Sequence, residues 1–461
     1  MSTTSGSIAA VQLARVLRAR GPALVRDLRT AVGMSPATFS RTIATMRREV
    51  LAVGATRSLT YALRRVIPGL PAEIPLYEVG PGASRVFAVL HPVEPRGFYV
   101  QSALPVGGFC PDLPWFLHDL RPAGFLGRLA PRQHPELGLP PDIQTWSADH
   151  ALRWLHEWGV DTVGSFVVGD PAFGRLQDHE SAGTVPEGQR VLRYPQMADE
   201  VVNLGVPGSS AAGEQPKFLT TRVAGQHRVR VLVKFSPKVG DLASRRTADL
   251  LRCEHHALAA LRFAGVPAAE SAIIEADNRV FLEVERFDRT PDGGRLGLVS
   301  LSALAAHEGA DIQGWSAAAD GLVSAGVVRS EDRARVYWLD RFGELIGNSD
   351  RHAGNLSFFF IDGRVGGLAP VYDMLPMRYA VRGGEFATPP LVVPQPTPRF
   401  AAGWRETWAA ATRFWRAVVG DHAIHDDLRR VAEENVRLLN NRRVLLDRLP
   451  TDSQVSLFGP T

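Results

Sequence analysis

The feature that most constrains the fold is a helical stretch followed by two apolar runs, in IGNSDRHAGNLSFFF and APVYDMLP. The helical stretch ends near Gly347, a short loop presents Asp350, and Asn355 follows five positions later, directly before a strand-like run. A second strand-like run carries Asp373. This alternation of helical and strand-like segments predicts an α+β architecture in which the two runs deliver polar side chains at their ends.

Two carboxylates and one amide in this order suit phosphoryl transfer. One carboxylate accepts the proton of the substrate hydroxyl, while an amide oxygen and a second carboxylate hold a magnesium ion. Protein kinases space the base and the amide as Asp-x-x-x-x-Asn and place the metal-binding aspartate on a following strand. Taken singly, Asp350, Asn355 and Asp373 would read as turn residues that cap local backbone. Their combination predicts an ATP- and Mg²⁺-dependent phosphotransferase core from about Gly205 to Asp373.

Lysine usage supports the same core. The chain holds 52 basic residues, yet lysine occurs only at Lys217, Lys234 and Lys238. Where arginine occupies nearly every basic position, a retained lysine indicates a site that needs a compact ammonium group. Lys234, in the strand-like run VRVLVKFSP, has the position of the kinase lysine that contacts nucleotide phosphates; the alternative is a lysine on an edge strand. Chance clustering of the three lysines remains the other interpretation.

Two further segments fit a nucleotide site. The small residues at 208–213 form a loop whose backbone N–H groups can cradle phosphates, although it lacks the spacing of a Walker loop. Alone, it can equally be the tip of a hairpin. The strand FLEVERFDR suits a hinge whose backbone reads the edge of a base. Its charged residues Glu285, Arg286 and Asp288 can equally form surface ion pairs.

With these residues in place, the chain resembles the HipA family of toxin kinases. SSAAGEQPKF, VLVKFSP, EVERFDR, NSDRHAGN and PVYDM occur in the order found in that family. The resemblance is close over about residues 205–380 and looser over 76–171. It implies that Asp350 is the catalytic base and that Asn355 and Asp373 hold magnesium. It further implies ATP contacts at Ala212, Gly213, Glu214, Gln215, Lys217, Lys234, Glu285, Phe287, His352 and Tyr372.

The resemblance also implies a regulatory device. Family members autophosphorylate a serine of the phosphate loop, which draws the loop out of the site, and the matching position is Ser210, with Ser209 as the neighbouring alternative. Glu254, on the helix after Lys234, is a candidate partner for that lysine. Pro216 departs from the family pattern because proline removes one backbone donor from the loop.

The first 65 residues are predicted to be a DNA-binding module. Apolar periodicity places helices at Ile8–Arg20 and Leu24–Val32, and Ser35-Pro36 starts a third helix that runs through about Arg48. LAVGATRSLTYALRR is expected to form two short strands around a turn, as a wing does. The segment thus resembles a winged helix-turn-helix, as in the longer YjjJ-type branch of the HipA family.

Charge supports DNA contact by this module. The module contains eleven arginines but only two acidic residues, Asp27 and Glu49. Such an excess of positive charge attracts phosphate backbones. The side chains predicted to face a DNA groove are Thr38, Ser40, Arg41 and Thr45, whereas Phe39, Ile43 and Met46 are predicted to pack inward. A three-helix bundle used for dimerisation or docking is the alternative.

These inferences predict a multidomain α+β protein whose HipA-like, protein-kinase-like fold ends in a helical lobe. The domains are predicted at 1–67, 76–171, 200–385 and 386–461, with a stiff linker at Pro68–Pro75. No apolar run reaches the ~20 residues of a membrane span, and the N-terminus lacks a signal-peptide layout. Cys110 and Cys253 show no metal-ligand spacing and are expected to be buried thiols. A cytoplasmic location, without membrane contact, is therefore expected.

Three functions fit these observations. The first is a growth-inhibiting serine/threonine protein kinase that uses ATP and Mg²⁺, acts on a protein substrate such as a translation component, and binds DNA through its N-terminal module. The second is a DNA-binding transcriptional regulator whose kinase-like part senses nucleotide without transferring phosphate. The third is a small-molecule kinase. The DNA operator, the oligomeric state and a separate antitoxin stay open at this point.

Overall fold

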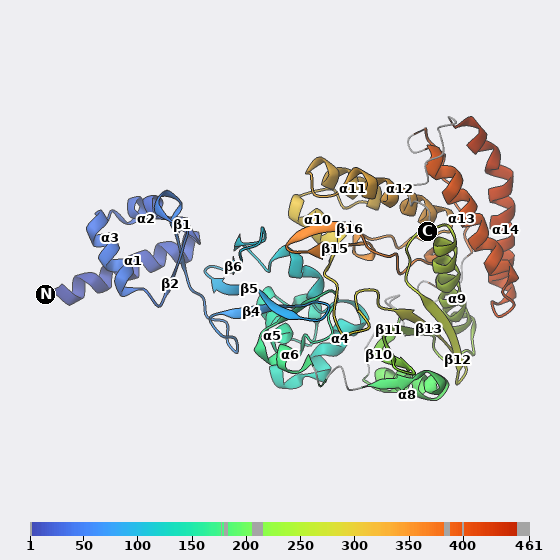
Figure 1. The fold of residues 1–461 in the computed structure, drawn as a ribbon, viewed down its shortest axis with the longest axis horizontal. Helices are drawn as coiled ribbons and strands as arrows, with labels where there is room; N and C mark the ends of the chain where they lie inside the picture. The colour runs from blue at the N-terminus through green and yellow to red at the C-terminus, as the bar shows by residue number, and fades with distance from the viewer. Residues whose placement is uncertain are drawn as a thin grey trace.

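The computed structural model describes residues 2–176, 178, 183–204, 215–381, 388–398 and 401–449. Figure 1 shows a small N-terminal unit at one end and a larger body that carries the other sheets and helices. Within the described ranges, no helix has both the length and the apolarity that crossing a membrane requires. Both cysteines are free thiols; Cys253 is buried, as expected, but Cys110 is only half-buried.

The N-terminal unit packs three helices on a small antiparallel sheet of order β1-β3-β2. The Ser35 hydroxyl accepts a hydrogen bond from the Thr38 N–H at 3.3 Å, which caps α3. Gly33, at a φ of 65°, ends α2. The elements are α1 (Ser2–Arg20), β1 (Ala23–Leu24), α2 (Val25–Val32), α3 (Pro36–Thr45), β2 (Val50–Val53) and β3 (Thr60–Leu63).

The three helices and two strands expected in this segment are therefore present. The first helix begins before Ile8 because the small polar residues 2–7 continue the helix without adding an apolar signal. The third ends at Thr45 instead of Arg48, since residues 46–49 form a turn that leads into β2. Phe39 and Met46 are buried together with Leu13, Leu17 and Leu28, and Ile43 packs beside them.

The segment that follows β3 packs against the larger body and is not a free linker. Ile67 and Ile74 are both buried in the core of the larger body, and β4 already begins at Ile74. Arg65 forms an ion pair with Asp149 and also donates its backbone N–H to the carbonyl of Pro92. These contacts attach the N-terminal unit to the neighbouring sheet.

That neighbouring sheet has five antiparallel strands in the order β7-β6-β5-β4-β8. Phe87, Phe116 and Phe166 pack on it, so the aromatic residues of this region are core residues, as expected. The elements are β4 (Ile74–Val79), β5 (Ser84–Val93), β6 (Gly97–Gln101), β7 (Gly108–Cys110), η2 (Trp115–Leu120), α4 (Gly124–Gln133), η3 (Pro135–Leu137), η4 (Ile143–Thr145), α5 (Ala148–Trp158), β8 (Phe166–Val168) and α6 (Asp170–Gly174).

A second five-stranded sheet, in the order β12-β13-β11-β10-β9, supports the predicted nucleotide site. Only the β9–β10 pairing is parallel. Asp241 caps the long helix α9 through Ser244, and α9 packs against this sheet (Figure 1). The elements are β9 (Thr184–Pro186), η5 (Glu187–Gln189), α8 (Arg190–Asn203), β10 (Lys217–Ala224), β11 (His227–Phe235), α9 (Leu242–Phe263), β12 (Ser271–Ala276) and β13 (Arg279–Glu285).

The remaining part is mainly helical and contains a three-stranded sheet of order β14-β15-β16. One hydrophobic core runs from the first five-stranded sheet into these helices; Phe360 of β15 packs against Phe116 and Phe166. The elements are β14 (Leu298–Ser300), α10 (Leu301–Glu308), α11 (Trp315–Ser324), α12 (Ser330–Leu345), η6 (Ala353–Asn355), β15 (Ser357–Ile361), β16 (Arg364–Leu368), η7 (Met377–Tyr379), α13 (Ala401–Gly420), α14 (Asp426–Arg442) and η8 (Arg443–Arg448).

Candidate active site

The loop after α12 presents the predicted base. Gly347, at a φ of 75°, turns the chain out of the helix. The exposed Asp350 donates its backbone N–H to Oδ1 of Asn348 at 2.9 Å. Asn355 donates Nδ2 to the backbone carbonyl of Asp350 at 3.2 Å. The loop therefore closes on itself, and its carboxylate faces outward, where a substrate hydroxyl can approach.

Arg351 fixes this loop to α12, a role that the sequence did not reveal. Its Nε lies 2.9 Å from Oδ1 of Asp340, and it also donates to the backbone carbonyl of Asn348. Gly343 leaves room for the side chain, since a Cβ there would lie 2.3 Å from Cδ of Arg351. A charged pair eleven positions apart, across the end of a helix, carries no periodic signal that would have identified it.

Lys234 joins two carboxylates at the centre of the site. Its Nζ lies 2.7 Å from both carboxylate oxygens of Glu254 on α9 and 2.6 Å from Oδ1 of Asp373. The Lys234 and Glu254 side chains are 8% and 1% exposed, whereas Asp373 is 32% exposed. The expected pairing of Glu254 with Lys234 is thus present, and Asp373 is the member of the triad that a ligand can reach.

Burial and charge act in opposite directions on this triad. Burial alone would lower the pKa of Lys234, but the carboxylates of Asp373 and Glu254 outweigh it and raise that pKa. Burial alone would raise the pKa of Asp373, but the Lys234 ammonium outweighs it and holds that pKa below its usual range. Lys234 is therefore a cation and Asp373 an anion at neutral pH.

Hydrogen bonds connect the loop at 346–352, which carries Asp350 and is called the base loop below, to the segment that carries Asp373. Asn348 Nδ2 lies 3.4 Å from the sulfur of Met374. The Tyr372 hydroxyl donates to the carbonyl of Gly354 at 3.0 Å and lies 2.8 Å from the Ser357 hydroxyl. Asp373 itself has a φ of 55°, a left-handed conformation that is uncommon outside glycine and recurs at functional sites. These bonds link the loop that carries Asp350 to the segment that carries Asp373, and Asp373 in turn contacts Lys234.

The oxygen ligands among the described residues suit a magnesium ion that is bound together with a nucleotide. No group of three or more His, Cys, Asp or Glu side chains in the described residues could hold a metal by itself. Magnesium usually takes one or two protein oxygens and completes its shell with water and phosphate oxygens. The Asp373 carboxylate and the Asn355 amide oxygen are ligands of the required kind.

Only part of the predicted phosphate loop can be placed. Gln215 donates Nε2 to the carbonyl of Phe235 at 2.7 Å, and Lys217 lies opposite Lys234 in the β10–β11 register. Ser209, Ser210, Ala212, Gly213 and Glu214 lie outside the described residues.

The predicted hinge connects the nucleotide sheet to the first five-stranded sheet. Phe287 lies beside Tyr372, with ring centroids 5.9 Å apart, and the Glu285 carboxylate forms an ion pair with Arg222. Arg286 and Asp288 form ion pairs, but these are buried, unlike the surface pairs that the sequence allowed.

His352 and three of the four predicted DNA-facing residues are exposed. His352 is exposed, and its carbonyl accepts a hydrogen bond from Trp315 Nε1 at 2.9 Å. Ser40, Arg41 and Thr45 are exposed on α3, whereas Thr38 is half-buried and its hydroxyl contacts the Ser35 cap at 3.0 Å.

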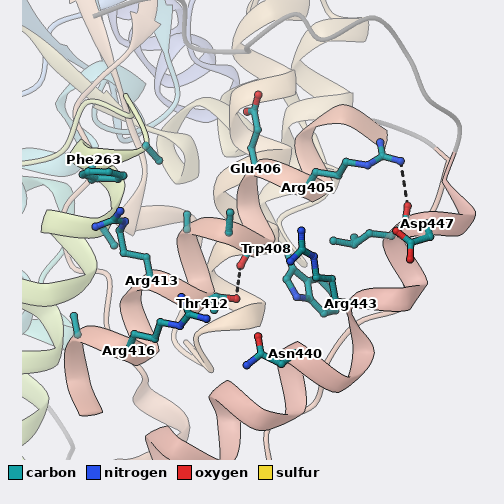
Figure 2. A pocket seen from close by; sticks show the side chains of 16 residues that line it. Phe263, Arg405, Glu406, Trp408, Thr412, Arg413, Arg416, Asn440, Arg443 and Asp447 are labelled. Atoms are coloured by element: carbon teal, nitrogen blue, oxygen red, sulfur yellow. Dashed lines mark hydrogen bonds between the residues drawn. The ribbon is translucent and has the colours of Figure 1, made fainter. Parts of the chain in front are cut away.

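A separate cavity of about 910 Å³ lies between α9, α13 and α14 and contains none of the predicted site residues. Figure 2 shows Arg405, Arg413, Arg416 and Arg443 around it, with Arg413 stacked on Phe263. Arg405 donates to the carbonyls of Leu446, within η8, and of Leu449, which follows η8. Size alone does not make this cavity the candidate active site, because the residues predicted to act in catalysis lie elsewhere.

Known proteins match the chain in the same regions. A model of the YjjJ-like toxin middle domain matches residues 70–177, and a model of the HipA-like C-terminal domain matches residues 209–436. A chain of the solved Shewanella oneidensis MR-1 complex of HipA, HipB and operator DNA shares the fold, with a TM-score of 0.50 at 16% identity. It covers 81% of this chain and 97% of its own. The expected HipA-like fold is thus confirmed.

One relative establishes the family. Toxin YjjJ from Escherichia coli (strain K12) is 35% identical over 424 residues, which span 90% of this chain and 94% of that protein. Identity at this level over nearly the whole length of both proteins, together with the middle-domain match, shows that the chain belongs to the YjjJ-like toxin family.

Proposed function

We propose that this protein is an ATP- and Mg²⁺-dependent serine/threonine protein kinase that acts as a growth-inhibiting toxin in the cytoplasm. The observation that carries the proposal is the contact of Lys234 with both Glu254 and Asp373. This arrangement keeps one buried cation beside one reachable carboxylate, which a nucleotide phosphate and its metal ion require. The outward-facing Asp350 supplies the proton acceptor.

Each residue has a distinct part in the proposed reaction. Asp350 accepts the proton of a serine or threonine hydroxyl as that oxygen attacks the terminal phosphate of ATP. Lys234, held by Glu254, contacts phosphate oxygens, and Asp373 with Asn355 holds the magnesium ion. The metal screens the negative charge of the phosphates. Arg351 keeps Asp350 in place through its bond to Asp340. Gln215, Lys217, Phe287, His352 and Tyr372 surround the nucleotide, and the backbone at Glu285 contacts its base.

The experiment that tests this proposal compares ATP turnover of the wild type with that of Asp350→Ala and Asp373→Asn. Loss of a general base or a metal ligand is expected to lower turnover by about 10²–10⁴-fold. Arg437→Gln, on the exposed face of α14, is the matched control and should leave turnover unchanged. Equal turnover in all four proteins would reject the proposal.

Autophosphorylation of the phosphate loop is the proposed means of regulation. The acceptor is Ser210 or the adjacent Ser209, and a phosphate there draws the loop out of the site. Mass spectrometry after incubation with ATP and magnesium should locate the phosphate in this loop in the wild type and not in Asp350→Ala. Its absence from an enzyme that still binds ATP favours the second candidate, a DNA-binding regulator that senses nucleotide.

The N-terminal unit is proposed to bind DNA as a winged helix. Ser40, Arg41 and Thr45 are exposed on one helix, as groove contacts require. The solved HipA complex contains HipB and operator DNA, which supports a DNA partner and an antitoxin as proposals for this chain. Arg41→Ala should weaken binding of a DNA duplex in a mobility-shift assay, whereas Arg437→Gln should not.

The proposed acceptor is a protein, such as a component of translation. The relative named a toxin supports growth inhibition. Expression of the wild type should therefore slow growth of the host cell, while Asp350→Ala should not. Phosphorylation of a metabolite without any protein acceptor would assign a small-molecule kinase instead.

A further inference from the structure

A second cavity, of about 520 Å³, lies beside the hinge and holds an excess of positive charge. Its walls come from β10, from the first half of β11 and from the loop that follows the hinge. Its described lining contains no aromatic side chain; the residues are Thr221, Arg228, Arg230, Arg289, Thr290, Pro291, Asp292, Gly293, Gly294 and Arg295. A cavity lined by charged and polar groups, without aromatic side chains, suits a charged polar ligand better than a flat base.

Two buried polar groups in this wall lack hydrogen-bond partners among the described residues. Arg295 is 3% exposed, and its Nη1 donates to no acceptor among the described residues. Thr221 is 1% exposed, and its hydroxyl also has no partner in the described part of the chain. Buried donors are satisfied in the great majority of cases, so two unsatisfied donors at one cavity indicate a ligand that accepts from both.

The buried charges around Arg295 do not balance. Three guanidinium groups, of Arg286, Arg289 and Arg295, face the two carboxylates of Asp161 and Asp288. Arg286 and Arg289 each form ion pairs with both carboxylates, at N···O distances of 2.7–3.0 Å. Burial, and then the neighbouring Arg289, lower the pKa of Arg295. The nearby Asp292 is exposed and accepts the hydroxyl of Thr290.

The wall is also held in place before any ligand arrives. The Arg295 N–H donates to the carbonyl of Val79 at 3.1 Å, which ties the loop to β4. Gly294 lies so close to Pro81 that a Cβ would come within 2.5 Å of its Cα. Thr221 and Arg230 are direct partners in the β10–β11 register, so both stand on one face of the sheet. Groups fixed in this way lose little entropy on binding.

We propose that this cavity is a binding site for a phosphate-type oxyanion, with Arg295 and Thr221 as buried donors and Arg230 as a third. Guanidinium and hydroxyl groups are the donors that phosphate oxygens accept. The ligand is free phosphate or a small phosphorylated compound. The bound anion supplies the missing negative charge and links the post-hinge loop to β10 and β11.

This site is separate from the candidate active site and does not depend on the proposed kinase function. Lys234 lies four residues beyond Arg230 on β11 and contacts Glu254 and Asp373. The post-hinge loop joins the two regions, because Arg286 donates its backbone N–H to the carbonyl of Arg230 at 2.9 Å. Phosphate binding here can therefore be measured apart from nucleotide binding.

The test measures phosphate binding to the full chain by calorimetry, with chloride at matched ionic strength as the reference. The variants are Arg295→Met and Arg230→Gln, with Arg437→Gln as a control on an exposed helix. Removing one charge-assisted bond should weaken phosphate binding at least about tenfold in the first two and not in the control. Lys234→Met removes the lysine that is proposed to contact the phosphates of ATP. This variant should bind free phosphate as tightly as the wild type.

Stability provides the second readout. In chloride, Arg295→Met should unfold at the same temperature as the wild type or higher, because it removes an uncompensated buried charge. Phosphate should raise the unfolding temperature of the wild type and not that of Arg295→Met.

A second ligand identifies the source of the phosphate group. Binding of O-phospho-L-serine as well as phosphate assigns the site to phosphorylated compounds; binding of phosphate alone assigns it to the free ion. The proposal is overturned if phosphate acts no differently from chloride, or if Arg295→Met binds it as well as the wild type.

Discussion

Replacing Glu254 with glutamine tests the physical basis of the site. Both carboxylate oxygens of Glu254 lie 2.7 Å from Nζ of Lys234, and both side chains are buried. Glutamine keeps one oxygen acceptor but directs an NH₂ donor toward the ammonium group. Removal of a buried partner altogether costs about 3–5 kcal/mol. Because Asp373 still balances Lys234 at 2.6 Å, we expect a smaller loss of about 1.5–3 kcal/mol, the value of one charged hydrogen bond.

Urea unfolding followed by tryptophan fluorescence measures this loss, since Trp315, Trp338 and Trp415 are buried in the helical part of the molecule. The matched control is Glu275→Gln, which weakens the ion pair between Arg252 and an exposed carboxylate on β12. An exposed partner should cost about 0.5 kcal/mol or less. The ATP affinity of Glu254→Gln should also fall, because Lys234 loses the group that positions it. The same unfolding midpoint and ATP affinity as the wild type would refute this reasoning.

Three other perturbations test separate parts of the structure. Burial alone would raise the pKa of Asp288, but Arg286 and Arg289 hold it at about 2. Its stabilisation is therefore present above about pH 4 and is lost as the pH falls toward 2. The difference in unfolding free energy between wild type and Asp288→Asn, about 3 kcal/mol at pH 7, should shrink in that range; a constant difference would contradict the assignment. Arg351→Ala, which releases the base loop from Asp340, should lower kcat about tenfold or more at an unchanged KM for ATP, and an altered KM alone would oppose that role. Phe39→Ala should destabilise the N-terminal unit by about 3–5 kcal/mol, visible as faster proteolysis there, while ATP turnover stays constant.

Local signals made the centre of the site predictable. The spacing of Asp350 and Asn355 required only a helix end and the following strand, β15, and the structure has both. The second strand-like run, which was expected to carry Asp373, is not a strand: β16 ends at Leu368, and Val371 forms only an isolated bridge with Ala268. Lys234 stood out because so few lysines remain in the chain. The structure brings Lys234 into contact with Glu254, the candidate partner that accompanied the family resemblance, and also with Asp373, a contact that the sequence did not predict. In the N-terminal unit, Ser35-Pro36 and Gly33 marked helix ends for the same local reason.

Contacts between distant segments could not be predicted in this way. Arg286 meets Asp161 across 125 residues, and each of them looks like an ordinary surface charge in sequence. The post-hinge loop beside Arg295 has no motif, since its character arises from burial against Val79 and Pro81. The segment at 68–75 was expected to be a stiff linker because of its prolines, yet Ile67 and Ile74 anchor both of its ends in the core.

The central claim is transfer of phosphate from ATP to a protein hydroxyl by the site around Asp350. Quantitative phosphoproteomics of cells that express the wild type or Asp350→Ala tests it most directly. We predict that specific serine or threonine sites gain phosphate only with the wild type, and that one of them lies on a protein whose loss of activity slows growth. Indistinguishable phosphoproteomes at equal expression of the two proteins would contradict the claim.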